Sequence, residues 1–284
     1  MRTADEVISL LGDVSLLNRI SPLREGNCLT LPRSGRLIVC GDIHGYRYAY
    51  EKAVKYAALH KNPDTHIVFQ EVIHGGPLSQ TGADVSFELL FELAELKKRY
   101  PENVHIILAN HDCSVITNSD ILKNGMEING AFIQGVKDAY GERWEDVLIA
   151  IKQFLFYLPL CARTESGLFI SHSLPIPRFY DDFDDSIFER PLMLADFQRP
   201  NSVYSFTWGR KHSLESLEEM AERFGAKCFL LAHQKYPEGF LILPPNTVII
   251  VSEHSNGCVC ELNLADECDF TALQKGIKHL IDLY

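Results

Sequence analysis

Between residues 36 and 109 short apolar runs alternate with longer amphipathic segments, and this alternation constrains the fold more than any other feature. Short apolar runs bounded by turns are typical of buried strands, whereas apolar residues that recur every three or four positions indicate helices. The order strand, helix, strand, helix, strand at this spacing is typical of βαβ units and predicts a largely parallel sheet. The predicted strands are 36–40, 65–70 and 104–109, and the predicted helices are 46–61 and 86–100.

The rest of the chain predicts further helices, strands and one long loop. Residues 129–158 carry apolar residues at helical spacing, with a break near Gly141. The loop at 173–205 contains four prolines and the acidic run DDFDD. The strands near the end of the chain follow one another so closely that antiparallel or mixed pairing is favoured. The other predicted helices are 3–18, 213–224 and 270–284, and the other predicted strands are 167–171, 227–232, 239–243, 247–251 and 258–262.

The composition excludes several classes of protein. The chain has 284 residues, of which 46% are hydrophobic and 23% charged, as in ordinary globular proteins. Its net charge of −11 argues against a protein that grips nucleic-acid backbones. The first residues lack the apolar core of a secretion signal, and no apolar run is long enough to span a membrane. We therefore expect a cytoplasmic protein without a membrane partner, whose eight cysteines are reduced.

Polar side chains that could bind a metal follow five of the predicted strands. In open α/β sheets, functional groups gather at the carboxyl ends of the strands. A single Asp or His at such a position is usually a helix cap or a hydrogen-bonded core residue. Five such strand ends are hard to explain by capping. The residues are Asp42 and His44 after 36–40, Glu71 and His74 after 65–70, Asn110, His111 and Asp112 after 104–109, His172 after 167–171, and His233 after 227–232.

This set of carboxylate, amide and imidazole groups fits a pair of divalent metal ions. Such mixed ligands suit Mn, Fe or Zn better than they suit a thiolate zinc site or an all-oxygen calcium site. Asp42 and His44, two residues apart in a turn between glycines, can converge on one ion. Two dications about 3.5–4 Å apart need a negatively charged ligand between them. Glu71 is the carboxylate at the required strand end, so we expect it to bridge the two ions.

At these residues the chain resembles the calcineurin-like metallophosphoesterases, and within them the phosphoprotein phosphatases. The family motifs are GDxHG, GDxxDRG, GNHE and two separated histidines. The corresponding segments are GDIHG (41–45), QEVIHGG (70–76), ANHD (109–112), SHS (171–173) and AHQ (232–234), within a resemblance that runs from about residue 36 to 264. It implies an α/β fold in which a two-sheet β-sandwich is flanked by helices, as a single domain over 1–284 with the helix at 3–18 and a helical segment at 117–158 as additions to its core.

The same resemblance implies the roles of individual residues. His111 would be the general acid, Arg210 would clamp the phosphate, and a hydroxide between two divalent metals would attack phosphorus in line. An exposed arginine without a role remains the alternative for Arg210. The implied metal ligands are Asp42, His44 and Glu71 for one ion, and Glu71, Asn110, His172 and His233 for the other.

The chain departs from the family within QEVIHGG. The bridging Asp of the family is Glu71, the Asp that pairs with the general acid is His74, and a phosphate-binding Arg is Gly75. A carboxylate beside His111 would favour its protonated form, whereas a neutral imidazole lacks that charge. We therefore expect metal binding to be retained and catalysis to be weaker or altered, with His74 as a further catalytic residue.

Several alternatives remain open. Glu71-Val-Ile-His74 also matches the Glu-x-x-His element of di-iron helical bundles, but that arrangement needs a helix and a second copy. The acidic run at 181–185 could be a solvated loop or could repel highly anionic substrates. By the resemblance, Glu253 and His254 would lie near the metals and could contact substrate.

The leading hypothesis is a metal-dependent phosphatase that acts on phosphoserine or phosphothreonine in proteins. One alternative keeps the metals but takes a nucleotide or another small phosphoester as substrate. Another is a catalytically impaired phosphatase-like protein that binds phosphate or a partner without turnover. The sequence names no regulatory partner.

Overall fold

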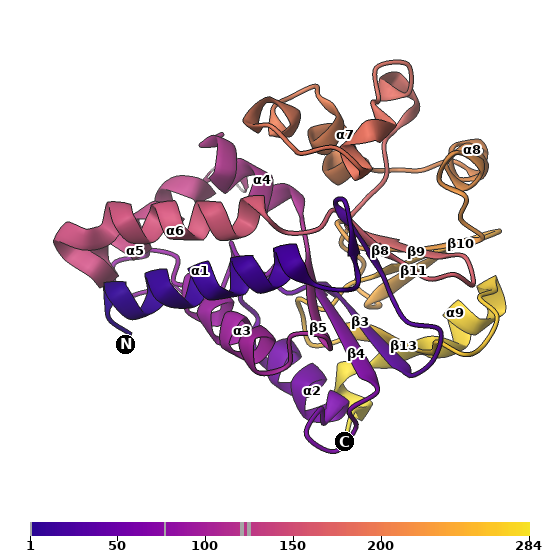
Figure 1. The fold of residues 1–284 in the computed structure, drawn as a ribbon, viewed down its shortest axis with the longest axis horizontal. Coiled ribbons are helices and arrows are strands. Elements are labelled where there is room, and N and C mark those ends of the chain that lie inside the picture. The colour runs from indigo at the N-terminus through magenta and orange to yellow at the C-terminus, as the bar shows by residue number, and fades with distance from the viewer. Residues whose placement is uncertain (1, 77, 120–121, 124–125) are drawn as a thin grey trace.

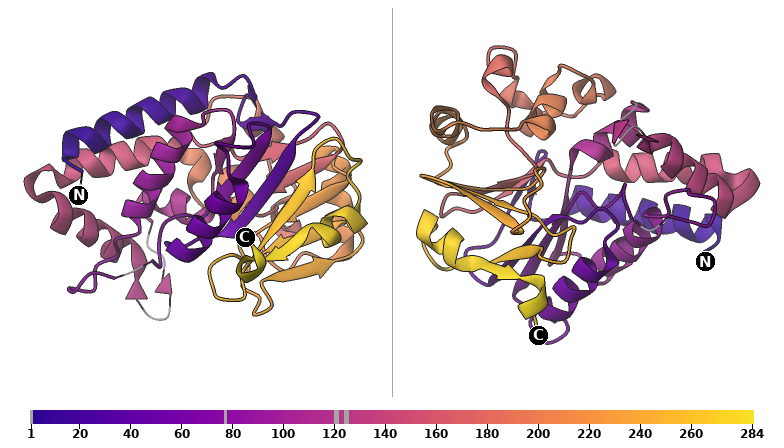
Figure 2. Two further views of the ribbon diagram at one scale, coloured as in Figure 1. Left: turned by 90° about the horizontal axis from the view of Figure 1, so that it is seen from below. Right: turned by 180° about the vertical axis from the view of Figure 1, so that it is seen from behind.

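A computed structural model describes residues 2–76, 78–119, 122–123 and 126–284. The chain forms two large sheets that pack against each other, with α2 (Arg47–Ala57) and α3 (Phe87–Arg99) outside one sheet and α7 (Ser202–Trp208) and α8 (Leu214–Phe224) outside the other (Figures 1 and 2). The predicted two-sheet sandwich flanked by helices is therefore confirmed.

The five-stranded sheet contains the strands predicted from the alternating pattern. Its strand order is β14, β13, β3, β4, β5, and β3 pairs parallel with β4, as β4 does with β5. The prediction of parallel βαβ units is correct. The strands are β3 (Arg36–Asp42), β4 (Thr65–Gln70), β5 (Val104–Ile107), β13 (Cys258–Asn263) and β14 (Ile277–His279).

The seven-stranded sheet is mixed, as predicted for the closely spaced strands. Its order is β1, β2, β8, β9, β10, β12, β11; β10 is parallel to β9 and β12, whereas β11 is antiparallel to β12. The strands are β1 (Arg24–Glu25), β2 (Cys28–Thr30), β8 (Cys161–Arg163), β9 (Leu168–Ser171), β10 (Cys228–Leu231), β11 (Phe240–Leu243) and β12 (Thr247–Ile250). The sequence did not reveal β1, β2 and β8, because runs of two or three residues carry no readable periodicity.

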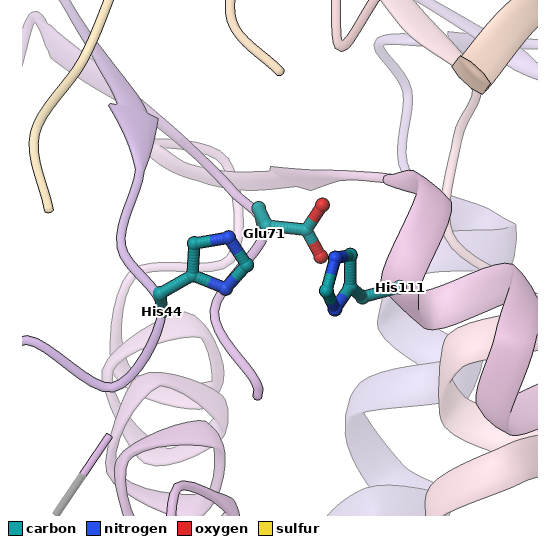
Figure 3. Close-up of side chains that lie close together, drawn as sticks. All are labelled: His44, Glu71 and His111. Carbon is teal, nitrogen blue, oxygen red and sulfur yellow. The ribbon is translucent and has the colours of Figure 1, made fainter. Parts of the chain in front are cut away.

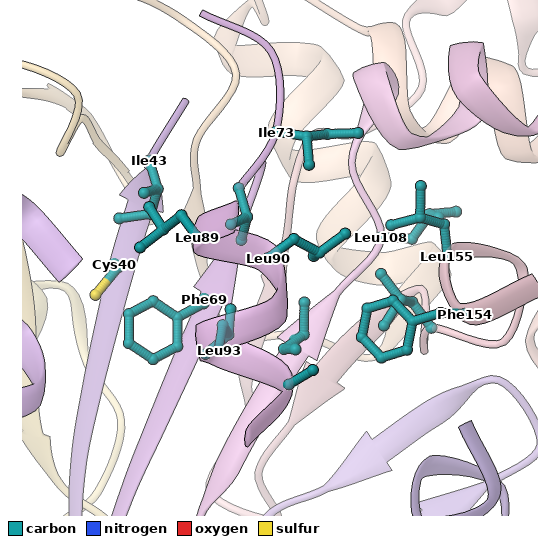
Figure 4. Close-up of a cluster of buried hydrophobic side chains, with 14 of the residues drawn as sticks. Cys40, Ile43, Phe69, Ile73, Leu89, Leu90, Leu93, Leu108, Phe154 and Leu155 are labelled. Carbon is teal, nitrogen blue, oxygen red and sulfur yellow. The ribbon is translucent and has the colours of Figure 1, made fainter. Parts of the chain in front are cut away.

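Both faces of β3 are buried, which explains its continuous apolar run. Leu37 and Val39 belong to the core between the two sheets. Ile38 and Cys40 belong to the larger core beneath the helices, part of which is drawn in Figure 4. The polar residues at the end of β3, beginning with Asp42, are therefore carried by a strand that is held in place from both sides.

The predicted helices are present with shifted ends. Thr3 caps the first helix in a capping box with Glu6, and the Ser213 side chain accepts a hydrogen bond from the Ser216 N–H at the start of α8. The helical stretch at 129–158 breaks at Gly141, as predicted. The remaining helices are α1 (Ala4–Ile20), α4 (Asn110–Thr117), α5 (Ile128–Tyr140), α6 (Trp144–Phe156) and α9 (Phe270–Gly276). Between α4 and α5, β6 (Leu122–Lys123) pairs with β7 (Met126–Glu127).

The helix predicted at 270–284 is wrong in its second half. Helix α9 ends at Gly276, and Ile277–His279 form β14, which pairs antiparallel with β13. The local pattern favours a helix, but the exposed backbone groups along the edge of β13 offer hydrogen-bond partners that an isolated segment does not have. Tertiary pairing therefore overrides the helical spacing.

The acidic run in the long loop is partly tied to the domain. Asp184 and Asp196 both form ion pairs with Arg190, and Asp185 pairs with Arg223 of α8. The loop also contains the short 3-10 helices Pro177–Phe179, Asp185–Phe188 and Leu194–Phe197.

All eight cysteines are free thiols, as expected. Within the part of the chain that the structure describes, no helix combines the length and the apolar character needed to cross a membrane.

Candidate metal and catalytic site

The predicted site residues come from both sheets. The carboxyl ends of β3, β4 and β5 in one sheet meet those of β9 and β10 in the other. Contacts across this junction are direct, since the His233 backbone N–H donates to Oδ1 of Asp42 at 3.1 Å and Asp42 forms a parallel bridge with Val251. All six candidate metal ligands are buried, namely Asp42, His44, Glu71, Asn110, His172 and His233.

Two turns that carry site residues are locked together. The N–H groups of Ile43 and His44 donate to the carbonyl oxygen of Glu71 at 3.1 and 2.7 Å. A Cβ atom on Gly45 would lie 2.4 Å from the Cα of Gly76, so only glycine allows this approach. GDIHG and QEVIHGG therefore act as one structural unit.

Four non-glycine residues at the site adopt left-handed backbone conformations: His44, Glu71, His74 and His233, with φ of 45°, 47°, 64° and 69°. Such conformations cost on the order of 1–3 kcal/mol each and persist where the surrounding structure imposes them, most often at functional sites. The strained backbone therefore marks these turns as candidates for a functional role, independently of their side chains.

The first group of potential metal ligands lies around His44. Its Nδ1 lies 3.1 Å from the carbonyl oxygen of Ile73, which can only accept, so Nδ1 carries the ring proton in the neutral imidazole and Nε2 carries the lone pair. That Nε2 lies 3.9 Å from Oδ2 of Asp42. The ligand atoms of His44, Glu71 and His111 lie within 4.8 Å of one another, and Figure 3 shows the Glu71 carboxylate between the two imidazoles. We call Asp42, His44 and Glu71 the first donor group.

The second donor group consists of Glu71, Asn110, His172 and His233. Nε2 of His172 lies 2.7 Å from Oδ1 of Asn110, 3.0 Å from Nδ1 of His233 and 3.1 Å from Oε2 of Glu71. Nδ1 of His233 lies 2.9 Å from the same Asn110 oxygen.

These separations fit a metal site. A zinc-like ion lies about 2.0–2.2 Å from its nitrogen and oxygen ligands, which places neighbouring ligand atoms about 3 Å apart. Oxygen and imidazole nitrogen donors also suit divalent transition metals. Among the described residues, Glu71 belongs both to the cluster with His44 and His111 and to the cluster with His172 and His233, which is the position that a bridging carboxylate requires.

The electrostatics of the site also favour cations. Burial raises the pKa of Asp42 to about 7, although the neighbouring His172 lowers it. Burial, together with the charge of Glu71, raises the pKa of Asp112 well above its usual range. Burial lowers the pKa of His172 to about 4 and that of His233 well below its usual range. The site thus gathers neutral imidazoles and carboxyl groups that a positive ion would stabilise in their ionised form.

His74 lies beside His111, as the sequence predicts. Its Nδ1 lies 3.1 Å from Nδ1 of His111, and its backbone N–H donates to Oγ of Ser86 at 2.9 Å. His111 lies in the first turn of α4, and the ring of Trp208 is nearly parallel to it at a centroid distance of 6.5 Å. The structure therefore brings His74 and His111 together.

Arg210 lies in the loop between α7 and α8, beside the second donor group. Its side chain is exposed, and its Nε–H donates to Nε2 of His233 at 2.9 Å. Gly75, where the resemblance implies an arginine in relatives, has φ of 108° and donates its N–H to Oδ2 of Asp84 at 3.1 Å. Among the predicted residues, Arg210 is thus the cation that the fold places near the donor groups.

Of the two residues that the resemblance implies near the metals, Glu253 lies beside the first donor group and His254 faces away from it. Oε2 of Glu253 is 3.7 Å from Nε2 of His44, and its Oε1 is 2.7 Å from Nζ of Lys235. The ring of His254 instead contacts the carbonyl oxygen of Tyr236 at 3.0 Å. The strand-end rule could have found Glu253, because it follows β12, which is parallel to β10.

Comparison with known proteins places this site in a family. A family model described as calcineurin-like phosphoesterase matches residues 35–237, a range that contains all six candidate ligands. The fold resembles that of a protein serine/threonine phosphatase from Saccharomyces cerevisiae with similarity to human phosphatase PP5, at 16% identity and a TM-score of 0.66, over 92% of this chain and 83% of that chain.

The fold also resembles that of a cold-active protein-tyrosine phosphatase of a psychrophilic Shewanella, at 11% identity and a TM-score of 0.54, over 93% of this chain and 84% of that chain. At such low identity these two likenesses show a shared fold. The family model, by contrast, matches more than half of the chain. The chain therefore belongs to the calcineurin-like phosphoesterase family of metal-using hydrolases, and it is a phosphoesterase.

Proposed function

We propose that this phosphoesterase removes phosphate from phosphoserine and phosphothreonine in proteins, with the help of two divalent metal ions. The observation that carries the proposal is the position of the buried Glu71 carboxylate, which lies close to His44 and His111 on one side and to His172 and His233 on the other. The resemblance of the motifs to phosphoprotein phosphatases and the likeness in fold to a serine/threonine phosphatase support this substrate class.

In this proposal the first donor group holds one ion and the second holds the other, with Glu71 shared. Mixed oxygen and nitrogen donors favour Mn, Fe or Zn. When bound, the two ions supply charge neutralisation for the phosphate and activation of the attacking water. The left-handed turns keep the donor atoms in place before the ions arrive, because QEVIHGG and GDIHG are hydrogen-bonded to each other.

His111 is the proposed general acid. Its Nδ1 contacts Nδ1 of His74, which leaves Nε2 to hold the proton that passes to the leaving oxygen. One of the two Nδ1 atoms must carry the proton between them, so the pair keeps His111 oriented through the transfer. His74 therefore acts on the reaction through His111.

Arg210 is the proposed phosphate ligand. A guanidinium presents several N–H donors in a planar fork that matches phosphate oxygens. Its position next to His233 brings it to the edge of the second donor group, and its exposure leaves it room to turn toward a bound substrate.

The proposal is tested by hydrolysis of an aryl phosphate with Mn²⁺ added to the metal-free protein. We expect turnover by the wild type, a loss of at least about a hundredfold in kcat for His111→Asn, and weakened metal binding at the first donor group for Asp42→Asn. Absence of turnover with Mn²⁺, Fe²⁺ and Zn²⁺ would contradict the proposal and favour a phosphatase-like binding protein.

The substrate class needs a second comparison. kcat/KM for phosphoserine and phosphothreonine peptides is measured against that for a dinucleoside polyphosphate at the same metal concentration. A clear preference for the peptides supports the proposal, and a clear preference for the dinucleotide assigns the site to small phosphoesters instead.

A further inference from the structure

The loop that follows β12 brings an additional carboxylate to the first donor group. Val251 bridges to Asp42, and Oγ of Ser252 accepts the N–H of Gly41 at 2.9 Å while donating to the carbonyl oxygen of Cys258 at 2.6 Å. A Cβ atom on Gly41 would lie 2.0 Å from the carbonyl oxygen of Ile250, so the backbone segments at Gly41 and Ile250 can approach this closely only because residue 41 is glycine. Glu253, the next residue, is therefore held against the turn that carries Asp42.

The carboxylate of Glu253 has a defined orientation. Its side chain is only 10% exposed, and Lys235 holds one oxygen at 2.7 Å. The other oxygen lies 3.7 Å from Nε2 of His44. That nitrogen carries the lone pair when His44 is neutral, because Nδ1 faces the Ile73 carbonyl oxygen.

Oε2 of Glu253 and Oδ2 of Asp42 thus both lie near the same nitrogen of His44, at 3.7 and 3.9 Å. Two carboxylate oxygens therefore lie near the lone pair of His44. This combination of donors suits a hard divalent cation such as Mn²⁺.

We propose that Glu253 supplies a carboxylate oxygen to the divalent ion of the first donor group. The inference rests on the proposed two-metal function. It gives this site three carboxylates, Asp42, Glu71 and Glu253, so the ion is bound by more negative charge than the motif residues provide. Lys235 orients the carboxylate and partly neutralises its charge through the ion pair. Lys235 is not itself a metal ligand.

The test measures Mn²⁺ binding to the metal-free full-length chain by isothermal titration calorimetry, without substrate. We expect two sites in the wild type and a decrease in affinity of about tenfold or more at one site in Glu253→Gln, with partial recovery in Glu253→Asp. Glu238→Gln is the matched control, since this exposed glutamate lies in the neighbouring loop. Circular dichroism of each metal-free variant verifies that it folds.

A second variant separates a metal ligand from a structural ion pair. Lys235→Gln removes the partner but leaves the carboxylate, so a ligand role predicts unchanged or tighter Mn²⁺ binding in this variant. Equal weakening by Glu253→Gln and Lys235→Gln would overturn the inference, as would unchanged affinity in Glu253→Gln. A wild type that binds no metal would instead contradict the proposed function itself.

Discussion

Nδ1 of His74 lies 3.1 Å from Nδ1 of His111, so the two imidazoles share one proton. An aspartate at position 74 would instead place a negative charge beside His111. This contact joins the second motif turn to the first turn of α4. A neutral partner orients His111 as well as a carboxylate does, but it does not attract the positive charge of the imidazolium.

Replacing His74 by Asp should therefore increase activity. A carboxylate at this distance raises the protonated fraction of His111 above neutral pH by up to about tenfold, and kcat at pH 8 should rise by a similar factor. The pH–rate profile of His74→Asp, compared with that of His74→Asn, measures the effect. An identical profile in all three proteins would show that His111 does not depend on the charge of its neighbour.

Metal binding should weaken as the solution is acidified below pH 7. In the metal-free fold the pKa of Asp42 is raised from 3.8 to about 7, so below pH 7 a proton must leave before this carboxylate can bind a cation. The affinity of one site for Mn²⁺ should fall by about tenfold per pH unit between 7 and 5. His172, with a pKa of about 4, stays neutral over that range and does not limit binding.

Calorimetric titrations at pH 7, 6 and 5 test this dependence. The accompanying proton release should be close to one for the ion that binds the first donor group at pH 6. Asp42→Asn should remove both the steep dependence and most of the affinity. A flat profile in the wild type would mean that Asp42 is already ionised in the metal-free protein.

Removal of Arg210 should strengthen metal binding. The Nε–H of Arg210 donates to Nε2 of His233, so the ring proton of His233 lies on Nδ1, facing Asn110. A metal bound at Nδ1 of His233 needs the lone pair of that nitrogen, so the ring proton must move to Nε2. There the proton would face the Nε–H of Arg210, which is also a donor.

Wild-type protein must break this charged hydrogen bond, worth about 1.5 kcal/mol or more, before His233 can bind a metal. Arg210→Ala should therefore bind the ion of the second donor group about tenfold more tightly and yet show a higher KM for phosphoester. Lys211→Ala, the adjacent exposed cation, is the control and should change neither quantity. Weaker metal binding in Arg210→Ala would contradict this account.

Two glycine substitutions should affect stability in opposite directions. Gly12 lies exposed within α1 with open space where a Cβ would be, and Gly12→Ala should stabilise the fold by about 0.5–1 kcal/mol. Gly41→Ala places a methyl group 2.0 Å from the carbonyl oxygen of Ile250 and should destabilise it by several times that amount, about 3 kcal/mol. Urea unfolding of the metal-free variants gives both values. Similar midpoints for the two variants would show that the junction at Gly41 can relax.

Much of the site was predictable from the sequence because its signal is local. Strands such as Arg36–Asp42 are buried on both faces, so they appear as continuous apolar runs, and a polar residue at the end of one is conspicuous. Asp42, Glu71 and Asn110 were found in this way. The helix at Ala4–Ile20 and the break at Gly141 were equally visible as changes in periodicity.

The tertiary structure alone decided the contacts between residues that are far apart in the chain. The strand ends meet because two separate sheets pack with their carboxyl ends together, and no periodicity encodes that packing. β14 forms where the local pattern favours a helix, because the edge of β13 supplies its hydrogen bonds. The approach of Glu253 to His44 depends on Gly41 admitting the backbone of β12. The sequence by itself determined which side chains stand at the strand ends, and only the fold determined which of them lie close enough together to bind the same ion or to share a hydrogen bond.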